Sequence, residues 1–313
     1  MKSISRKWTA VMAVIVFAGF AGGALAGAAK LKGRITADGS STVGPYTTSA
    51  AEGFQRKHSG VQVTVGISGT GGGFERFCNG EIDLADASRP IKSTEYAKCR
   101  EKGIKWVAFT VANDGIAIVV NKQNTWANCL TVDQLKKIWA PGSKVDNWKD
   151  VDASFPDVKL KLYGPGTDSG TFDFFTEKIN GKSKSSRSDY SATENDNIAV
   201  QGVTGERGGL AYFGLSYFEA NQGKLNLVKV NDGRGCIAPS KKTVQNGTYK
   251  PLSRPLFIYS KRTSFRRPEV RSFIGYILNN ERAIATKARF VSLTDAQLRN
   301  SRSHYRQALK QVK

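Results

Sequence analysis

The sequence predicts an α/β fold with a largely parallel sheet. From residue 31 onward, short apolar runs typical of buried strands alternate with amphipathic stretches typical of helices. Runs of glycine and hydroxyl residues stand at three of the strand-to-helix turns. The chain has 313 residues, 40% of them hydrophobic and 23% charged, which is the length and composition of two globular domains.

In the first half, strands are expected where β-branched and other apolar residues cluster, at 35–37, 61–67, 82–86, 106–112 and 115–121. The pair Asn113-Asp114 separates the last two of these strands. Helices are expected between the strands at 47–57, 74–79 and 93–102. Ser93 or Thr94 is the expected N-cap of the third helix, because a side-chain oxygen there accepts from a free backbone N–H.

The second half repeats this alternation. A helix is expected at 131–139, with Thr131 as its cap and Pro141-Gly142 as its stop. Further strands are expected at 159–163, 208–213, 225–230 and 254–260. Further helices are expected at 171–179, 194–203 and 269–279, and the polar stretch 181–191 reads as a surface loop.

The first 26 residues have the pattern of a cleaved signal peptide. Lys2, Arg6 and Lys7 precede an apolar run at 8–20, and the A-x-A pattern at 24–26 marks a cleavage site. The alternative, an uncleaved membrane anchor, is disfavoured because the apolar run is short for a membrane span. No cysteine stands at the cleavage point for lipidation. We therefore expect export to the periplasm.

The chain is strongly basic, with a formal net charge of +21. The leader carries three basic residues and no acidic one, so its removal leaves +18. Such a charge suits a small anion, a nucleic acid or an anionic surface. Basic residues crowd the C-terminal stretch at 261, 262, 266, 267, 271, 299, 302 and 306, but no nucleic-acid-binding motif accompanies them. A solvated basic face that attracts anions is the favoured interpretation.

Four cysteines follow the leader, at 78, 99, 129 and 236. An even number of cysteines in an exported chain favours disulfides, and three pairings are possible. Spacing favours Cys78–Cys99, which closes a short loop, and this leaves Cys129–Cys236. A zinc site is disfavoured because the chain has no C-x-x-C and both histidines lie far from the cysteines in sequence.

Three glycine and hydroxyl runs dominate the chain, at 39–46, 68–74 and 166–172. Each precedes an expected helix, whose first backbone N–H groups and positive dipole end attract an anion. Alternatives are plain N-caps for the first run and a flexible linker for the second. None of the runs has the G-K-[ST] of a P-loop, which disfavours a nucleotide. Together the runs predict one small anion held from several sides.

These residues resemble the phosphate-binding proteins of bacterial ABC transporters, the PstS family, over nearly all of the chain after the leader. The resemblance rests on G-S-S-T-V-G-P at 39–45, S-G-T-G-G-G-F-E-R-F at 68–77, D-L-A-D-A-S-R-P-I-K at 83–92, D-S-G-T-F at 168–172, N-I-A-V-Q-G-V at 197–203 and G-G-L-A-Y-F-G at 208–214. It implies a periplasmic-binding-protein fold, in which two α/β lobes joined by a two-crossing hinge close over one dehydrated phosphate. It also implies a binding protein rather than an enzyme, with a membrane ABC permease as its partner.

The resemblance also implies which residues bind phosphate. The residues that match the family's donors are Ser41, Thr42, Val43, Thr70, Ser169, Gly170 and Thr171. Many members have an Asp, which accepts the phosphate proton, where this chain has Ser88, and an Arg where it has Pro165. Arg89 is expected to replace the missing guanidinium with a bidentate grip.

The proton acceptor is left open among three carboxylates, Asp86, Asp114 and Asp168, with Asp114 favoured because it sits at an apparent lobe crossing. Phosphate carries a proton at neutral pH and sulfate does not, so this acceptor sets the selectivity. Asn197 and Gln201 are lesser candidates for lining the cleft.

We expect lobe I at 28–112 plus 254–313 and lobe II at 113–253, so that each proposed disulfide stays within one lobe. We expect a monomer without cofactor, metal or nucleic acid. The alternatives are a binding protein for sulfate, molybdate or arsenate, a secreted phosphatase, and adhesion through the basic C-terminal stretch. The phosphatase is disfavoured because the chain lacks H-E-x-x-H, G-x-S-x-G and clustered histidines.

Overall fold

The structure is a computed structural model that describes residues 31–167, 169–193 and 195–311. The expected signal peptide lies outside the described residues. Within those three ranges, no helix has the length and hydrophobicity to cross a membrane. From Leu31 onward the chain forms one compact unit, which contains two α/β lobes as the family resemblance implies.

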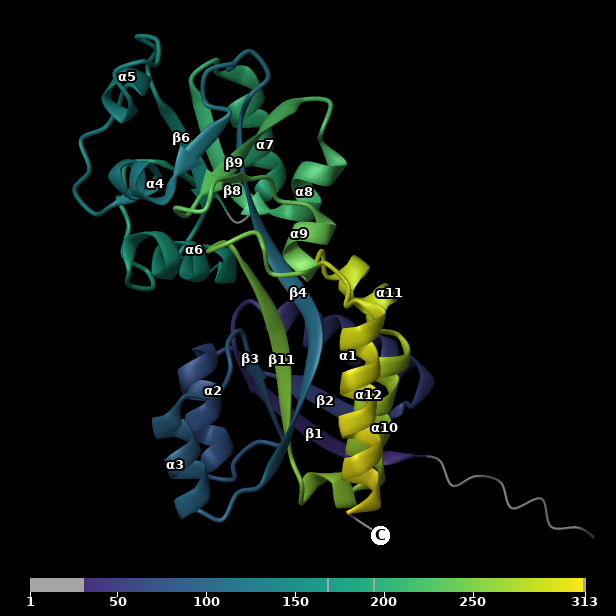
Figure 1. The fold of residues 1–313 in the computed structure, drawn as a ribbon. Helices are drawn as coiled ribbons and strands as arrows, with labels where there is room; N and C mark the ends of the chain where they lie inside the picture. The colour runs from purple at the N-terminus through teal and green to yellow at the C-terminus, as the bar shows by residue number, and fades with distance from the viewer. Residues whose placement is uncertain (1–30, 168, 194, 312–313) are drawn as a thin grey trace, which may run out of the picture. The chain divides into compact units, whose positions relative to one another are not determined.

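Lobe I is built on a sheet in which β1 (Lys32–Gly39) pairs in parallel with β2 (Gly60–Val65) and β3 (Leu84–Ala87). Strand β11 (Ser253–Lys261) adds to β3 in the antiparallel sense. Figure 1 shows the helices on both faces of this sheet. One face is covered by α1 (Gly44–Lys57), α10 (Pro268–Asn279) and α12 (Asp295–Lys310), and the other by α2 (Gly69–Cys78) and α3 (Ser93–Glu101).

Lobe II contains a second sheet, in which β6 (Lys161–Pro165) lies in parallel between β7 (Ser191–Thr193) and β8 (Gly209–Gly214). Strand β9 (Leu225–Asn231) pairs with β5 (Cys129–Thr131) and β10 (Cys236–Ile237). The surrounding helices are α4 (Val132–Trp139), α5 (Trp148–Val151), α6 (Gly170–Asn180), α7 (Asp196–Gly205), α8 (Leu215–Ala220) and α9 (Lys241–Gln245). Trp139 and Trp148 are fully buried in the core of this lobe.

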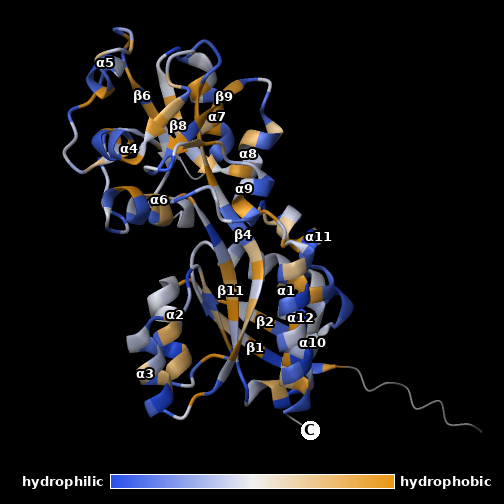
Figure 2. Cartoon of the chain, viewed as in Figure 1, coloured by the Kyte–Doolittle hydropathy of each residue, from blue (hydrophilic) through white to orange (hydrophobic). Residues whose placement is uncertain are grey.

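Two long strands join the lobes. Strand β4 (Trp106–Asn121) runs antiparallel to β11 in lobe I and to β8 and β9 in lobe II. Figure 2 shows apolar residues along much of β4 and β11, whereas α12 is largely hydrophilic on the side drawn. Each lobe has its own hydrophobic core. On β4, Ala112 packs in the core of lobe I and Ile116 in that of lobe II; around the start of β11, Leu252 packs in the core of lobe II and Leu256 in that of lobe I.

Two expectations about this region are wrong. Asn113 and Asp114 do not separate two strands but lie inside the single strand β4. Residues distant in sequence form hydrogen bonds with their side chains there. Asn113 Nδ2 donates to Gln297 Oε1 at 3.1 Å, and Asp114 Oδ2 accepts from Arg254 Nε at 3.3 Å. The sheet is also mixed rather than largely parallel, because β4 and β11 run against their neighbours.

A third segment reaches lobe II after α11 (Glu281–Lys287). Val291 packs in the core of lobe II and forms a bridge with Asn113. The backbone carbonyl of Arg289 accepts from Ser216 Oγ at 2.9 Å, and the Arg289 guanidinium lies 4.4 Å from the Tyr217 ring centre. The hinge region thus contains contacts beyond the two crossing strands.

The glycine run at 69–73 is not a loop before a helix, because α2 already begins at Gly69. Gly73 faces the end of β1, where an added Cβ would lie 2.5 Å from Gly39 Cα. The helix therefore packs against the strand more closely than a residue with a side chain allows. Close packing thus explains part of the glycine content that was expected to let a ligand approach the backbone.

The capping predictions have different outcomes. Thr131 caps α4 as expected, and its Oγ1 accepts from Gln134 N at 3.0 Å. Ser93 and Thr94 do not cap α3, because the helix starts at Ser93, and Glu95 Oε2 accepts from the Lys92 backbone N–H at 2.8 Å. Helix α12 was missed, although a capping box of Thr294 and Gln297 marks its start.

The disulfide predictions are confirmed. Cys78 pairs with Cys99, linking α2 to α3, and Cys129 pairs with Cys236, linking β5 to β10. The first bond lies in lobe I and the second in lobe II. Neither constrains the two strands that join the lobes.

Candidate functional site

A cavity of about 480 Å³ lies where β11 meets the ends of several helices. Lobe I lines it with residues 40–42 before α1, 69–71 at the start of α2 and 88–90 after β3. Lobe II lines it with Asp173, Phe174 and Glu177 of α6. Residues 253–255 of β11 form another part of the wall. The lining is mostly polar, as a site for a small hydrophilic ligand requires.

The N-terminal parts of three helices border this cavity. The turn before α1, the first residues of α2 and the beginning of α6 all contribute to the wall. Each of these helix starts carries the positive end of a helix dipole. The amides of Val43 and Gly44 at α1 already donate to the Ser40 carbonyl, and the Thr171 amide of α6 donates to Ser169 Oγ. Thr42 and Thr70, from two of the three glycine and hydroxyl runs, line the cavity together, whereas Ser169, Gly170 and Thr171 of the third run do not.

Five of the predicted site residues line the cavity: Ser41, Thr42, Thr70, Ser88 and Arg89. The Thr70 and Ser88 hydroxyls are 3.2 Å apart, and the Ser88 backbone N–H donates to Thr70 Oγ1. Ser41 Oγ donates across the lobes to Asp173 Oδ2 at 3.4 Å. The hydroxyls are therefore held in position by one another and by lobe II.

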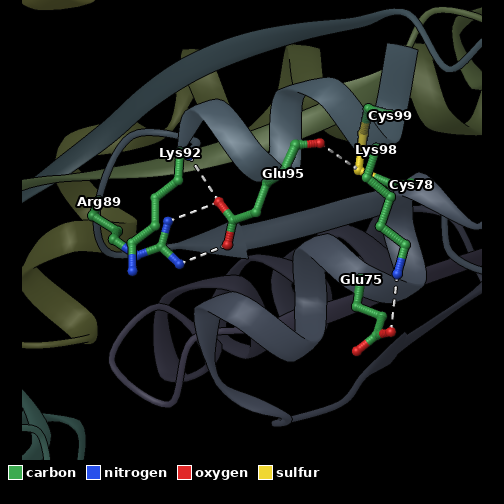
Figure 3. The surroundings of a disulfide bond; sticks show 7 residues. All are labelled: Glu75, Cys78, Arg89, Lys92, Glu95, Lys98 and Cys99. Carbon is green, nitrogen blue, oxygen red and sulfur yellow. Dashed lines mark hydrogen bonds and ion pairs between the residues drawn. A yellow bond between two sulfur atoms is a disulfide. The ribbon is translucent and has the colours of Figure 1, made fainter. Parts of the chain in front are cut away.

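Arg89 lines the cavity but already has a partner. Its Nη2 lies 2.7 Å from Glu95 Oε1, and its Nη1 lies 2.9 Å from Glu95 Oε2. Figure 3 shows this bidentate pair, with Lys92 beside it and the Cys78–Cys99 disulfide farther along α3. Both side chains are partly buried, with 26% and 16% of their surfaces exposed. The expected bidentate grip of Arg89 on an anion remains a prediction, and Glu95 competes for the same guanidinium.

Arg254, at the start of the crossing from lobe II into lobe I, is not among the site residues expected from the sequence. Arg254 Nη2 donates to Thr42 Oγ1 at 2.7 Å and to the Gly170 carbonyl at 3.4 Å, so it touches both lobes. Its Nε lies 3.3 Å from Asp114 Oδ2, and its guanidinium carbon lies 3.7 Å from the Phe174 ring centre. The available signal was a charged residue at the edge of an otherwise apolar strand.

The pair of Arg254 and Asp114 is largely buried, with 11% and 6% of their side chains exposed. Burial raises the pKa of Asp114 and lowers that of Arg254, although the charge of each residue opposes the shift of the other. One carboxylate therefore compensates the buried guanidinium incompletely. Nη1 of Arg254 has no hydrogen-bond partner within the described ranges. An anion in the cavity would be a second partner for this cation.

The other predicted site residues do not line the cavity. The Val43 amide donates to the Ser40 carbonyl at 3.1 Å. Ser169 Oγ caps α6 by accepting from the Thr171 amide at 3.2 Å. Gly170 abuts the opposite lobe, since an added Cβ would lie 2.4 Å from Thr42 N. The predicted roles of these residues, which lie next to the wall, remain predictions.

Neither Asp86 nor Asp114, the two candidate proton acceptors that the structure describes, lines the cavity. Asp114 is paired with Arg254, and Asp168 lies outside the described residues. Asp86 is buried beneath the turn before α1, where its Oδ1 accepts from Thr47 Oγ1 at 2.9 Å. Its Oδ2 has no hydrogen-bond partner in the described part of the chain.

Asp86 gives stability a predicted pH dependence. Burial raises its pKa to about 8, the Thr47 hydroxyl opposes this shift, and the Asp38 charge adds to it. An unfolded Asp loses its proton near pH 4. The folded state therefore holds an extra proton from about pH 4 to 8, and Asp86 makes stability fall as the pH rises through this window. We expect Asp86→Asn to match wild type near pH 4.5 and to be several kcal/mol more stable at pH 8.5.

Urea unfolding in phosphate-free buffers, at half-unit pH steps, measures this difference. Asp133→Asn is the control, because Asp133 is exposed and should change stability by less than about 0.5 kcal/mol. A constant difference between Asp86→Asn and wild type across the pH range would contradict the prediction.

The lesser candidates Asn197 and Gln201 are exposed, and Gln201 lines a different cavity beside β6 and β7. They are not brought to the cavity at β11. In the described ranges, no group of three or more His, Cys, Asp or Glu side chains is arranged to hold a metal ion.

Comparison with known proteins identifies relatives over most of the chain. Residues 25–281 match the model of the PBP superfamily domain. The Protein SphX of Synechococcus elongatus is 49% identical over 262 residues, which are 83% of this chain and 77% of that protein. The phosphate-binding protein PstS of Staphylococcus saprophyticus is 40% identical over 297 residues, which are 92% of this chain and 91% of that protein.

Among solved structures, this chain is also similar to phosphate-binding proteins. The crystal structure of a possible phosphate binding protein from Planctomyces limnophilus has a TM-score of 0.86 and 47% sequence identity. The match covers 89% of this chain and 99% of that one. An ABC-type phosphate transport receptor from Vibrio cholerae, 21% identical with a TM-score of 0.65, shares the fold.

Proposed function

Because this chain belongs to the PBP superfamily and, within it, to the family of the phosphate-binding proteins PstS, we propose that it binds inorganic phosphate and delivers it to a membrane ABC transporter. The observation that best supports this function is the polar cavity that the largely buried Arg254 lines together with the turn before α1, the start of α2 and the first turns of α6. Such a site offers positive charge and hydrogen-bond donors in a small polar space. A tetrahedral oxyanion has the charge and the acceptors to use them.

The proposed activity is binding and not catalysis. The family to which the chain belongs consists of binding proteins, and the cavity wall contains hydroxyls, guanidinium groups and helix ends. No histidine or cysteine stands among the described residues of the wall. The phosphatase alternative would need a nucleophile with a base or a metal to activate it.

In the proposed site, Thr42 and Thr70 donate their hydroxyls to the phosphate and Arg254 provides the largely buried positive charge. Arg89 is a second cation at the wall, which an incoming anion draws away from Glu95. Ser88, Ser169, Gly170 and Thr171 complete the set of donors when the lobes move around the ligand. Contacts from both lobes to one anion favour the closed state by population shift.

We further propose that lobe I comprises 28–112 and 254–313 and that lobe II comprises 113–253. The change of core between Ala112 and Ile116, and between Leu252 and Leu256, supports these boundaries. Residues 289–291 belong to the part of the chain proposed as lobe I, but they also contact lobe II. The chain is proposed to act as a monomer in the periplasm, after removal of the leader at 1–26.

Calorimetry with phosphate and sulfate tests the proposed function. We expect wild type to bind phosphate at micromolar concentration or below and sulfate at least about 100-fold more weakly, a difference of about 3 kcal/mol. Arg89→Ala should weaken phosphate binding by about 10- to 100-fold, because a charge-assisted bond to the anion is lost.

Glu95→Gln and the double variant Arg89→Ala/Glu95→Gln separate a ligand role of Arg89 from a purely structural role. If Arg89 serves only to neutralise Glu95, the double variant recovers wild-type affinity, whereas it stays as weak as Arg89→Ala if Arg89 grips the anion. If Arg89 grips the anion, Glu95→Gln frees the guanidinium and binds phosphate as tightly as wild type or more tightly. Absence of phosphate binding by folded wild type would refute the proposed function.

A further inference from the structure

We propose that the carboxylate of Asp173 accepts a hydrogen bond from the protonated oxygen of phosphate and thereby excludes oxyanions that carry no proton. This inference rests on the proposed phosphate-binding function and names the residue that sets its selectivity. Asp173 lies two residues after the S-G-T motif. It is not one of the three proton acceptors expected from the sequence, and it is not one of the donors that the family resemblance implies.

The position of Asp173 suits this role. It stands in the first turn of α6, lines the cavity, and reaches lobe I through Ser41 Oγ, which donates to its Oδ2 at 3.4 Å. Its other oxygen, Oδ1, is shielded from solvent and has no hydrogen-bond partner within the described ranges, so a ligand meets it when the lobes move around the anion. A buried acceptor without a donor costs free energy. A ligand that brings its own proton removes this cost.

The other described carboxylates are less suited to the role. Asp114 is held by Arg254 at 3.3 Å, and Asp86 is covered by the turn before α1. Glu177 lines the cavity, but it is exposed and pairs with Lys178 at 3.0 Å. Asp173 is therefore the described carboxylate that combines a place in the wall with an unpaired, dry oxygen.

The charged groups around Asp173 come from three elements. Glu177 and Lys178 stand on α6 itself, Lys184 on the loop after α6, and Arg254 on β11. Burial raises the pKa of Asp173, Lys184, the Ser41 hydroxyl and Arg254 oppose this shift, and Glu177 adds to it. The carboxylate is thus a better proton acceptor than one in water, and the nearby cations offset its repulsion of an anion.

The protonation states of the anions explain how this acceptor would discriminate between them. Phosphate keeps at least one proton throughout the neutral pH range, so one oxygen can donate to Asp173. Sulfate and monofluorophosphate are tetrahedral dianions of similar size that have no proton near pH 8. Each would place a bare oxygen or fluorine against Asp173, which leaves two acceptors facing each other with like charge.

Calorimetry at pH 8 on wild type, Asp173→Asn and the matched control Asp133→Asn tests this inference. The ligands are phosphate, sulfate and monofluorophosphate. For Asp173→Asn we expect phosphate affinity to fall by about 10- to 100-fold and the affinity for the two unprotonated anions to rise by at least about 10-fold. Asn replaces the repelling oxygen with an N–H donor, so the two changes have opposite signs. Asp133→Asn should keep the wild-type ratio of affinities within about threefold, because Asp133 is exposed in the first turn of α4 and does not line this cavity.

If Asp173 has a purely structural role, Asp173→Asn should lower the affinity for all three anions together. That result would overturn the inference and leave the proposed function intact. Binding of phosphate by Asp173→Asn with wild-type discrimination would also overturn it. Failure of wild type to bind phosphate would instead remove the proposed function itself, and the inference with it. Asp173→Ser has the same expected loss of discrimination and provides the test if the Asn variant does not fold.

Discussion

Arg254→Met is expected to lower phosphate affinity by about three orders of magnitude, or about 4 kcal/mol. Arg254 is the largely buried cation of the cavity, and its Nη2 joins Thr42 of lobe I to the carbonyl of Gly170 in lobe II. Removal of this side chain takes away the main charge opposite the anion and a link between the lobes. Met fills similar volume and retains the contact with the Phe174 ring, so packing changes little.

The same substitution leaves Asp114 as an uncompensated carboxylate, since Arg254 is its ion-pair partner. A buried pair that loses one member destabilises the fold by about 3–5 kcal/mol unless the remaining group becomes neutral. Burial already raises the pKa of Asp114, so protonation limits this loss at low pH. We expect the stability deficit of Arg254→Met to grow as the pH rises.

The double variant Arg254→Met/Asp114→Asn separates stability from binding. It removes both charges, so we expect it to recover most of the unfolding free energy while phosphate binding stays as weak as in the single variant. Asp114→Asn alone should bind phosphate at least as well as wild type, because Arg254 then has no competing anion. Recovery of wild-type affinity by the double variant would show that Arg254 acts only through the fold.

The position of this residue shows what could not be read from the sequence. The glycine and hydroxyl runs could be found because each is a local pattern of glycines and hydroxyl residues at a helix start. Arg254 instead contacts Thr42 and Gly170, which are 212 and 84 positions away. No local pattern encodes such a contact, since it depends on how β11 crosses between the lobes. Asp173 was missed for a similar reason, because its partner Ser41 lies 132 positions away.

The wrong strand break has the same origin. Asn113-Asp114 is a pair that favours turns in an isolated sequence. In the folded chain, Gln297 and Arg254 supply hydrogen bonds to these side chains, and β4 continues through both residues. Tertiary partners thus override a local preference at the point where the chain crosses between the lobes. The glycine run of α2 is a second case, because the close approach of Gly73 to Gly39 cannot be seen in the sequence.

Loss of the Cys129–Cys236 disulfide is expected to destabilise lobe II by about 4–5 kcal/mol in the chain-entropy model. The bond spans 107 positions, so its removal frees a long loop in the unfolded state. The bond Cys78–Cys99 spans 21 positions, and its loss should cost lobe I about 3 kcal/mol. The double Ser variant of each pair should therefore lower the free energy of unfolding by a different amount, and should do so in a different lobe.

Tryptophan fluorescence can report this difference, because Trp126, Trp139 and Trp148 belong to lobe II and Trp106 to lobe I. During urea unfolding, Cys129→Ser/Cys236→Ser should shift the large fluorescence transition to lower urea, and Cys78→Ser/Cys99→Ser should shift it less. Neither disulfide lines the cavity, so we expect phosphate affinity within about threefold of wild type for the folded fraction of each variant. Equal shifts for the two variants would mean that the lobes unfold as one cooperative unit, and that the longer loop gives its lobe no separate gain in stability.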